Sequence, residues 1–368
     1  MNLIDLGWNK FFERHFEQFR NQGLVPARIA REHKGLYFIF SQYGELSARI
    51  SGKLRHNIKS RAELPAVGDW VAVQPRPDEH KATILALLPR KSLFSRKAVL
   101  SGGMPDSGGK TEQQVLSANV DTVFLVCGLD ADFNPRRIER YLTVAWDSGA
   151  SPVIVLNKID LCMDIKDKVA EVESVAFSVP IHPVSATKNQ GLENIQKYLS
   201  RGKTAVLLGS SGVGKSSIIN KMLGQENLKV REVRAYDSRG RHTTASRQMI
   251  LLPDGGIVID TPGMRELALW DNEEGIERTF SDIAELAHGC RFRDCSHQNE
   301  PGCAVQQALK AGTLNPNRYS NYIKLQKELK HLALRQDTKA RRSSERSFDK
   351  KIRQRLKVQR EIEGKGKL

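Results

Sequence analysis

The residues best suited to chemistry form a glycine-rich segment that ends in a lysine and a serine. It runs from Gly209 to Ser216 and follows the apolar run 204–208. A strand, this pattern and then a helix are typical of a phosphate-binding loop, because the backbone N–H groups can turn inward around phosphate oxygens. Lys215 would supply charge to the β- and γ-phosphates, and Ser216 would ligate Mg²⁺. The predicted phosphate-binding residues are Gly209, Ser210, Ser211, Gly212, Val213, Gly214, Lys215, Ser216 and Ser217.

A second motif, Asn157-Lys158-Ile159-Asp160, predicts which base the site accepts. The carboxylate of Asp160 can accept hydrogen bonds from N1–H and the exocyclic amino group of guanine, whereas adenine offers no such pair of donors. Ser185-Ala186 follows at a distance that suits a backbone N–H directed at guanine O6. The sequence therefore predicts GTP and GDP as ligands, rather than ATP.

Two further segments resemble the switches of a nucleotide-dependent protein. Asp260 begins the motif Asp-Thr-Pro-Gly, in which the Gly263 N–H can sense a γ-phosphate. Upstream, the polar stretch 230–247 is typical of a loop. Either Thr243 or Thr244 would close over the metal, and the spacing to the following strand favours Thr244. The predicted Mg²⁺ ligands are Ser216, Thr244 and Asp260.

Catalysis has two candidate residues. Lys215 would stabilise charge on the phosphates. Met264 follows Gly263, and its thioether cannot orient an attacking water, so we expect slow intrinsic hydrolysis. His242, beside the threonines of the first switch, is the nearest group that could orient the water; the alternative is that His242 is an exposed loop residue.

The order of these motifs is rotated. Base recognition (G4 and G5) precedes the phosphate loop (G1), which precedes the two switches (G2 and G3), whereas an ordinary GTPase begins with its phosphate loop. The same α/β sheet can be built from a different starting strand. The pattern therefore predicts a circularly permuted P-loop domain over residues 113–281.

Three cysteines and a histidine form another constellation. Cys290, Cys295, His297 and Cys303 make a closed four-ligand set suited to one structural Zn²⁺ per chain. A disulfide is the alternative, and it is disfavoured because the cysteine count is odd, at five, and because the chain opens without a secretory signal. Reduced thiols predict a cytoplasmic protein.

Charge is distributed unevenly along the 368 residues, whose net charge is +16. Residues 310–368 carry 18 Lys and Arg against 6 Asp and Glu, which favours binding to polyanions without base-specific readout. Long apolar runs are lacking, so no membrane span is expected.

The N-terminal third has short apolar runs separated by turns, which is typical of a small β-barrel. An OB-fold that binds RNA is expected, and an SH3-like barrel fits the pattern almost as well. Its predicted basic contacts are Lys53, Arg55, His56, Lys59, Arg61, Arg90, Lys91, Arg96 and Lys97.

In combination, these motifs resemble the bacterial ribosome small-subunit-dependent GTPase A family, a family of circularly permuted GTPases. Gly68-Asp69-Trp70-Val71, the segment from Gly240 to Thr244, and Glu300-Pro301-Gly302-Cys303 also carry the resemblance, which extends over nearly the whole chain. It implies an OB-fold, a central permuted G domain and a zinc-binding domain with C-terminal helices. It also implies rRNA contact, action late in small-subunit maturation, and GTP hydrolysis stimulated by that subunit.

The predicted organisation is an N-terminal extension (1–24), an OB-fold RNA-binding domain (25–100), a linker (101–112), the permuted G domain (113–281), a zinc-finger domain (282–334) and a basic tail (335–368). We expect a monomeric enzyme that hydrolyses the acid anhydride of GTP, with the small subunit and its rRNA as partners. The alternatives are a zinc-stabilised nucleic-acid-binding regulator that uses GTP only as a ligand, and a ribosome-associated protein with an inactive G domain.

Overall fold

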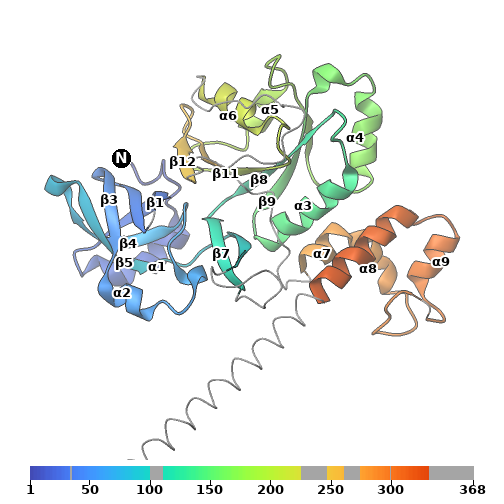
Figure 1. Ribbon diagram of the computed structural model, residues 1–368, viewed down its shortest axis with the longest axis horizontal. Helices are drawn as coiled ribbons and strands as arrows, with labels where there is room; N and C mark the ends of the chain where they lie inside the picture. Colours follow the sequence, from blue (N-terminus) through green and yellow to red (C-terminus); the bar gives the residue numbers. More distant parts are fainter. Residues whose placement is uncertain (34, 100–110, 225–246, 261–273, 299, 331–368) are drawn as a thin grey trace, which may run out of the picture.

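The computed structural model describes residues 1–33, 35–99, 111–224, 247–260, 274–298 and 300–330. Figure 1 shows an N-terminal barrel, a sheet flanked by helices and a C-terminal helical region, in that order along the chain. Within these ranges, none of the helices has the length and apolar character needed to cross a membrane. The predicted order of an all-β, an α/β and a helical part is confirmed.

Five strands close the N-terminal barrel: β1 (Val25–His33), β2 (Leu36–Ser41), β3 (Gly44–Ile50), β4 (Trp70–Arg76) and β5 (Lys81–Leu87). They pair in the order β1-β2-β3-β5-β4, and β4 returns to β1. Only the β3–β5 pair of this ring is parallel. A closed ring in this strand order, with helix α2 (Gly52–Asn57) after β3, is the topology of an OB-fold. The SH3-like alternative is therefore excluded.

One of the basic residues predicted to contact RNA is used inside the protein. Arg90 donates to both carboxylate oxygens of Asp69, at 2.8 and 2.7 Å, and Asp69 is fully buried. The prediction for Arg90 is therefore wrong, since its guanidinium neutralises a buried charge. Removing either partner alone would leave the other charge uncompensated.

The side chain of Arg28 links three parts of the chain by hydrogen bonds. One of them is the N-terminal segment that contains α1 (Lys10–Arg20). Its buried guanidinium donates to the carbonyl oxygens of Leu6 (2.5 Å), Gly68 (3.1 Å) and Asn119 (3.0 Å). These acceptors belong to the N-terminal segment, the barrel and the α/β part. Burial lowers the pKa of Arg28 to about 10, which still leaves the group charged at neutral pH.

The central sheet has five parallel strands in the order β10-β9-β8-β11-β13. Their bounds are β8 (Thr122–Gly128), β9 (Ser151–Asn157), β10 (Ile181–Pro183), β11 (Thr204–Leu208) and β13 (Ile257–Asp260). The helices α3 (Pro135–Asp147) and α4 (Ile165–Glu173) bury apolar residues against one face, and α5 (Leu192–Gln196) and α6 (Lys215–Leu223) cover the other. Burial on both faces explains the continuous apolar runs in the sequence.

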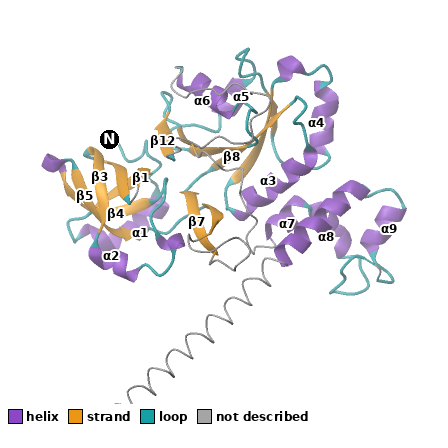
Figure 2. Ribbon diagram, in the orientation of Figure 1, coloured by secondary structure: helices purple, strands orange, loops and turns teal. Residues whose placement is uncertain are grey.

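Strand β12 (Gln248–Leu251) joins the strands of the barrel to those of the central α/β part (Figure 2). It is antiparallel to β13 along its whole length, and Gln248 also pairs with Arg31 of β1. The barrel and the α/β part thus share one hydrogen-bonded sheet. A separate ribbon consists of β6 (Leu93–Val99) and β7 (Thr111–Ala118), so the last two residues of the predicted linker 101–112 belong to a strand.

The C-terminal region packs against α3 (Figure 1). It contains α7 (Glu274–Thr279), α8 (Ser281–Ala287), α9 (Ala304–Lys310) and a further helical stretch over 316–330. Phe280, Ile283 and Leu325 are buried in the same apolar cluster as Ile138 and Leu142 of α3. One core therefore continues from the α/β sheet into the C-terminal helices.

Candidate nucleotide site and metal centre

The predicted base- and phosphate-binding residues lie at one edge of the central sheet. Parallel pairing brings the carboxyl ends of β9, β10, β11 and β13 to this edge. Asn157 ends β9, Gly209 follows β11 and Asp260 ends β13. In open α/β sheets this is the edge where nucleotides bind.

Two glycines of the phosphate loop are required because neighbouring atoms lie too close for a side chain. A Cβ at Gly209 would lie 2.2 Å from the carbonyl oxygen of Val126, and a Cβ at Gly214 would lie 2.2 Å from Asn157 Nδ2. Gly214 also has a φ of 95°, a conformation in which side chains are strained. The loop can therefore lie flat on the strand ends only with glycine at these positions.

Lys215 begins α6 and its side chain folds back over the loop. Its Nζ donates to the carbonyl oxygens of Gly209 (2.8 Å) and Ser210 (2.6 Å). These bonds hold the ammonium group beside the backbone that would surround the phosphates. Ser216 is the next residue of the helix, which places its hydroxyl on the first turn.

Asn157 connects the base-recognition residues to the phosphate loop. Its buried amide donates from Nδ2 to the Val213 carbonyl (2.8 Å), and its Oδ1 accepts from the Ala186 N–H (3.0 Å). The Ala186 N–H therefore already has an acceptor, and contact with guanine O6 requires that bond to be shared or exchanged. One side chain fixes three loops relative to one another.

Asp160 is exposed in the short helix Ile159–Leu161 and is held by two hydroxyls. Ser185 Oγ donates to one carboxylate oxygen at 2.5 Å, and Thr187 Oγ1 donates to the other at 3.2 Å. The hydrogen bond from Ser185 lowers the pKa of Asp160, so the group is an ionised acceptor at neutral pH. Thr187 was not predicted, because a lone threonine after a Ser-Ala dipeptide carries no signal.

Asp130 and Arg137, two other residues near the site, were not predicted. The predicted residue Lys158 has a φ of 69°, and its ammonium contacts Asp130 at 2.5 Å. Arg137 at the start of α3 donates to the Ser210 hydroxyl at 2.5 Å. Asp130 and Arg137 belong to the loop and helix after β8, which contain none of the nucleotide motifs.

Asp260 lies at the end of β13 between its neighbours β11 and β12. Burial raises the pKa of Asp260, and the positive charge of Lys215 acts in the opposite direction. A carboxylate beside the phosphate loop is a hard oxygen ligand of the type that Mg²⁺ prefers. The other predicted residues of the switches, His242, Thr243, Thr244, Gly263 and Met264, lie outside the described residues, as does the tail 335–368.

Cys290, Cys295, His297 and Cys303 come together in the C-terminal region. Their candidate ligand atoms all lie within 4.8 Å of one another, so the four residues could hold a metal ion. Cys290 Sγ and Cys303 Sγ are 3.8 Å apart, and His297 Nδ1 is 3.5 and 3.6 Å from these two sulfurs. All five cysteines of the chain are free thiols, which argues against the disulfide alternative.

A phosphate loop and a guanine-recognition motif at one sheet edge, with the recognition motif first in the chain, define a circularly permuted GTPase. The chain belongs to the RsgA GTPase family, whose family model matches residues 87–270. A relative named small ribosomal subunit biogenesis GTPase RsgA, from Opitutus terrae, is 46% identical and aligns with 99% of this chain and 100% of its own length. Its counterpart from Syntrophotalea carbinolica is 44% identical, with 94% of each chain covered.

Solved structures agree with this assignment. YjeQ from Thermotoga maritima has a TM-score of 0.62 at 29% identity, and the match covers 83% of this chain and 98% of that one. YloQ, described as a circularly permuted GTPase, has a TM-score of 0.59 at 26% identity, with 84% and 96% covered. The predicted family and the predicted permuted fold are thus confirmed.

Proposed function

We propose that this chain binds the small ribosomal subunit through its rRNA, acts late in the maturation of that subunit, and hydrolyses GTP to GDP and phosphate faster when the subunit is bound. The observation that carries the nucleotide chemistry is the Asn157 side chain, which fixes the base loops against the phosphate loop. The small ribosomal subunit in the names of the two relatives supports the choice of particle. We expect this chain to act as a monomer in the cytoplasm.

In this proposal, Asp160 accepts the two donors of guanine, and Ser185 and Thr187 keep its carboxylate oriented. Lys215 neutralises charge on the β- and γ-phosphates while the loop N–H groups bind their oxygens. Ser216, Thr244 and Asp260 would hold Mg²⁺, which supplies further neutralisation of phosphate charge when bound. The Gly263 N–H would contact the γ-phosphate, and His242 would orient the attacking water once the subunit is in place.

We also propose that the metal is one structural Zn²⁺. Zn–S bonds of about 2.3 Å and Zn–N bonds of about 2.0–2.1 Å, in a tetrahedron, separate two sulfurs by about 3.8 Å and a sulfur from a nitrogen by about 3.6 Å. The spacings of Cys290, Cys303 and His297 match both values. With all four positions taken by protein atoms, the ion would support the fold rather than a reaction.

The barrel supplies an exposed basic surface suited to rRNA. Five residues on and after α2 are exposed, with no acidic residue among positions 52–61: Lys53, Arg55, His56, Lys59 and Arg61. Basic side chains at such a density contact phosphates in any sequence context. The binding of the subunit should therefore weaken steeply as salt is raised.

The direct test of this function is GTP turnover by the purified chain with and without small subunits. We expect the small subunit to raise the turnover number and the large subunit, as an rRNA-containing control, to leave it unchanged. An equal rate in all three samples, with GTP still bound, would favour a regulator that uses GTP only as a ligand. Loss of the stimulation at high salt would link it to phosphate contacts.

Asp160→Asn should change which base is bound. The amide replaces one acceptor by a donor, so GDP affinity is expected to fall at least about tenfold while xanthine nucleotides bind more tightly. Competition of GDP, XDP and ADP against a fluorescent nucleotide measures this directly. Asp164→Asn, the same change at an exposed residue four positions later, is the control and should keep the preference for GDP. Equal affinity of the unmodified chain for ADP and GDP would contradict the assignment of Asp160.

A further inference from the structure

The first turn of helix α3 contacts the phosphate loop. Arg137 Nη1 donates to Ser210 Oγ at 2.5 Å and to Asp132 Oδ2 at 2.6 Å. Lys215 holds the carbonyl of the same serine. The second residue of the phosphate loop is thus held through its backbone by the loop lysine and through its hydroxyl by α3.

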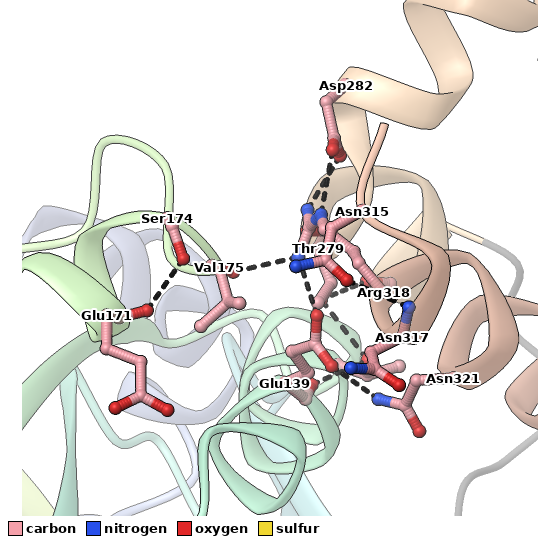
Figure 3. Close-up of polar contacts among 12 residues, drawn as sticks. Glu139, Glu171, Ser174, Val175, Thr279, Asp282, Asn315, Asn317, Arg318 and Asn321 are labelled. Atoms are coloured by element: carbon pink, nitrogen blue, oxygen red, sulfur yellow. Dashed lines mark hydrogen bonds and ion pairs between the residues drawn. The ribbon is translucent and has the colours of Figure 1, made fainter. Parts of the chain in front are cut away.

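The neighbouring residues of α3 bind the C-terminal region, and the main contact is Arg318 (Figure 3). Its buried guanidinium donates to Glu139 (2.7 Å), to both carboxylate oxygens of Asp282 (2.7 and 2.6 Å) and to the Thr279 carbonyl (2.9 Å). It also reaches the Val175 carbonyl beyond α4 at 3.2 Å. Three segments of the chain therefore meet on one side chain.

Further bonds extend this interface along the same turn of α3. Arg140 and Glu328 form two parallel bonds of 2.9 Å each, and Arg136 donates to Asn317 at 2.8 Å. Asn321 donates to the second oxygen of Glu139 at 2.5 Å. Paired guanidinium and carboxylate groups fix orientation as well as distance.

The energetics of these contacts favour docking as a unit. Burial raises the pKa of Glu139, and the positive charge of Arg318 opposes that rise. Removing either side chain would leave the other charge buried and uncompensated, which costs far more than the intact pair contributes. These pairs and the shared apolar cluster hold α3 and the C-terminal region in one arrangement.

We propose that α3 couples the C-terminal region to the phosphate loop, with Arg137 as the positioning residue that carries the coupling. This inference rests on the proposed guanine-nucleotide binding. When the C-terminal region is docked on Glu139 and Arg140, α3 presents Arg137 to Ser210 and the loop is held ready for phosphates. Because coupling between two sites is reciprocal, bound nucleotide in turn stabilises the docked C-terminal region.

The test uses the full-length protein and affinities for fluorescent GDP and a non-hydrolysable GTP analogue. Arg137→Met should weaken both about tenfold, and Arg137→Lys, which keeps a donor, should recover most of the loss. Glu328→Gln removes the negative charge that pairs with Arg140 in this interface, and it should weaken nucleotide binding about two- to fivefold. Glu171→Gln is the matched control, since Glu171 pairs with Lys168 on the exposed surface of α4. This variant should bind both nucleotides as tightly as the unmodified chain.

Hydrogen exchange separates coupling from a merely structural role. Saturating GDP should slow exchange over 316–330 in the unmodified chain and have little effect there in Arg137→Met. The coupling is overturned if Glu328→Gln binds nucleotide as tightly as the unmodified chain, and this variant decides the matter even where Arg137→Met does not fold. Failure of the unmodified chain to bind guanine nucleotides would overturn the proposed function as well, so the two failures are distinguishable.

Discussion

Replacing Lys215 with alanine is expected to reduce GTP turnover at least about a hundredfold, because charge that develops on the transferred phosphate loses its nearest cation. The ammonium group lies beside the carbonyls of Gly209 and Ser210, whereas the guanidinium of Arg137 contacts the Ser210 hydroxyl from α3. Turnover at saturating GTP, with small subunits present, measures the loss.

The matched control for this change is Lys221→Ala. Lys221 lies on the same helix, α6, but its side chain is exposed and distant from the loop end of the helix. Its removal should leave turnover unchanged. Wild-type turnover by Lys215→Ala would mean that the phosphates bind elsewhere, and it would contradict the assigned site.

Cys295→Ser is expected to unfold the C-terminal region locally and to abolish stoichiometric zinc. In small metal-binding units the binding free energy is folding free energy, on the order of 10 kcal/mol. Hydrogen exchange should rise over 288–330, and elemental analysis should find less than one zinc per chain. Guanine nucleotides should still bind because the base and phosphate contacts remain, with affinity reduced at least as much as in Glu328→Gln and by no more than about tenfold.

Cys162→Ser is the control for the metal prediction. Cys162 follows the base-recognition helix and is no part of the four-residue cluster. This variant should retain one zinc and normal exchange. Metal-replete wild-type protein without zinc would contradict the assignment of the cluster, whatever the behaviour of the variants.

The grouping of the candidate nucleotide residues at one sheet edge was predictable because these residues follow buried strands at fixed distances. Asn157 and Gly209 are in such positions, and parallel pairing brings the strand ends together whatever the order along the chain. The metal cluster was predictable for a similar reason, since its four ligands lie within 14 consecutive residues. Local spacing carries this kind of information well.

Contacts between distant residues were not predictable. The Arg318–Glu139 pair spans 179 positions and Arg137–Ser210 spans 73, and neither pair belongs to a motif. Charge alone also misled the interpretation of Arg90, because a basic residue beside a buried aspartate looks the same in sequence as one on the surface. The distinction between an OB-fold and an SH3-like barrel depends on the parallel β3–β5 pairing, which no local sequence pattern encodes.

The strand β12 has a consequence for how the chain folds during synthesis. The barrel strands lie within the first 87 residues and can pair as soon as they leave the ribosome, whereas the partner of Arg31 is Gln248. Until that residue emerges, the second half of β1 presents an open sheet edge, the kind of surface at which other chains add. We therefore expect truncated chains that end before β12 to aggregate. In the full chain, the pairing of β12 with β1 should be among the last steps in forming the sheet.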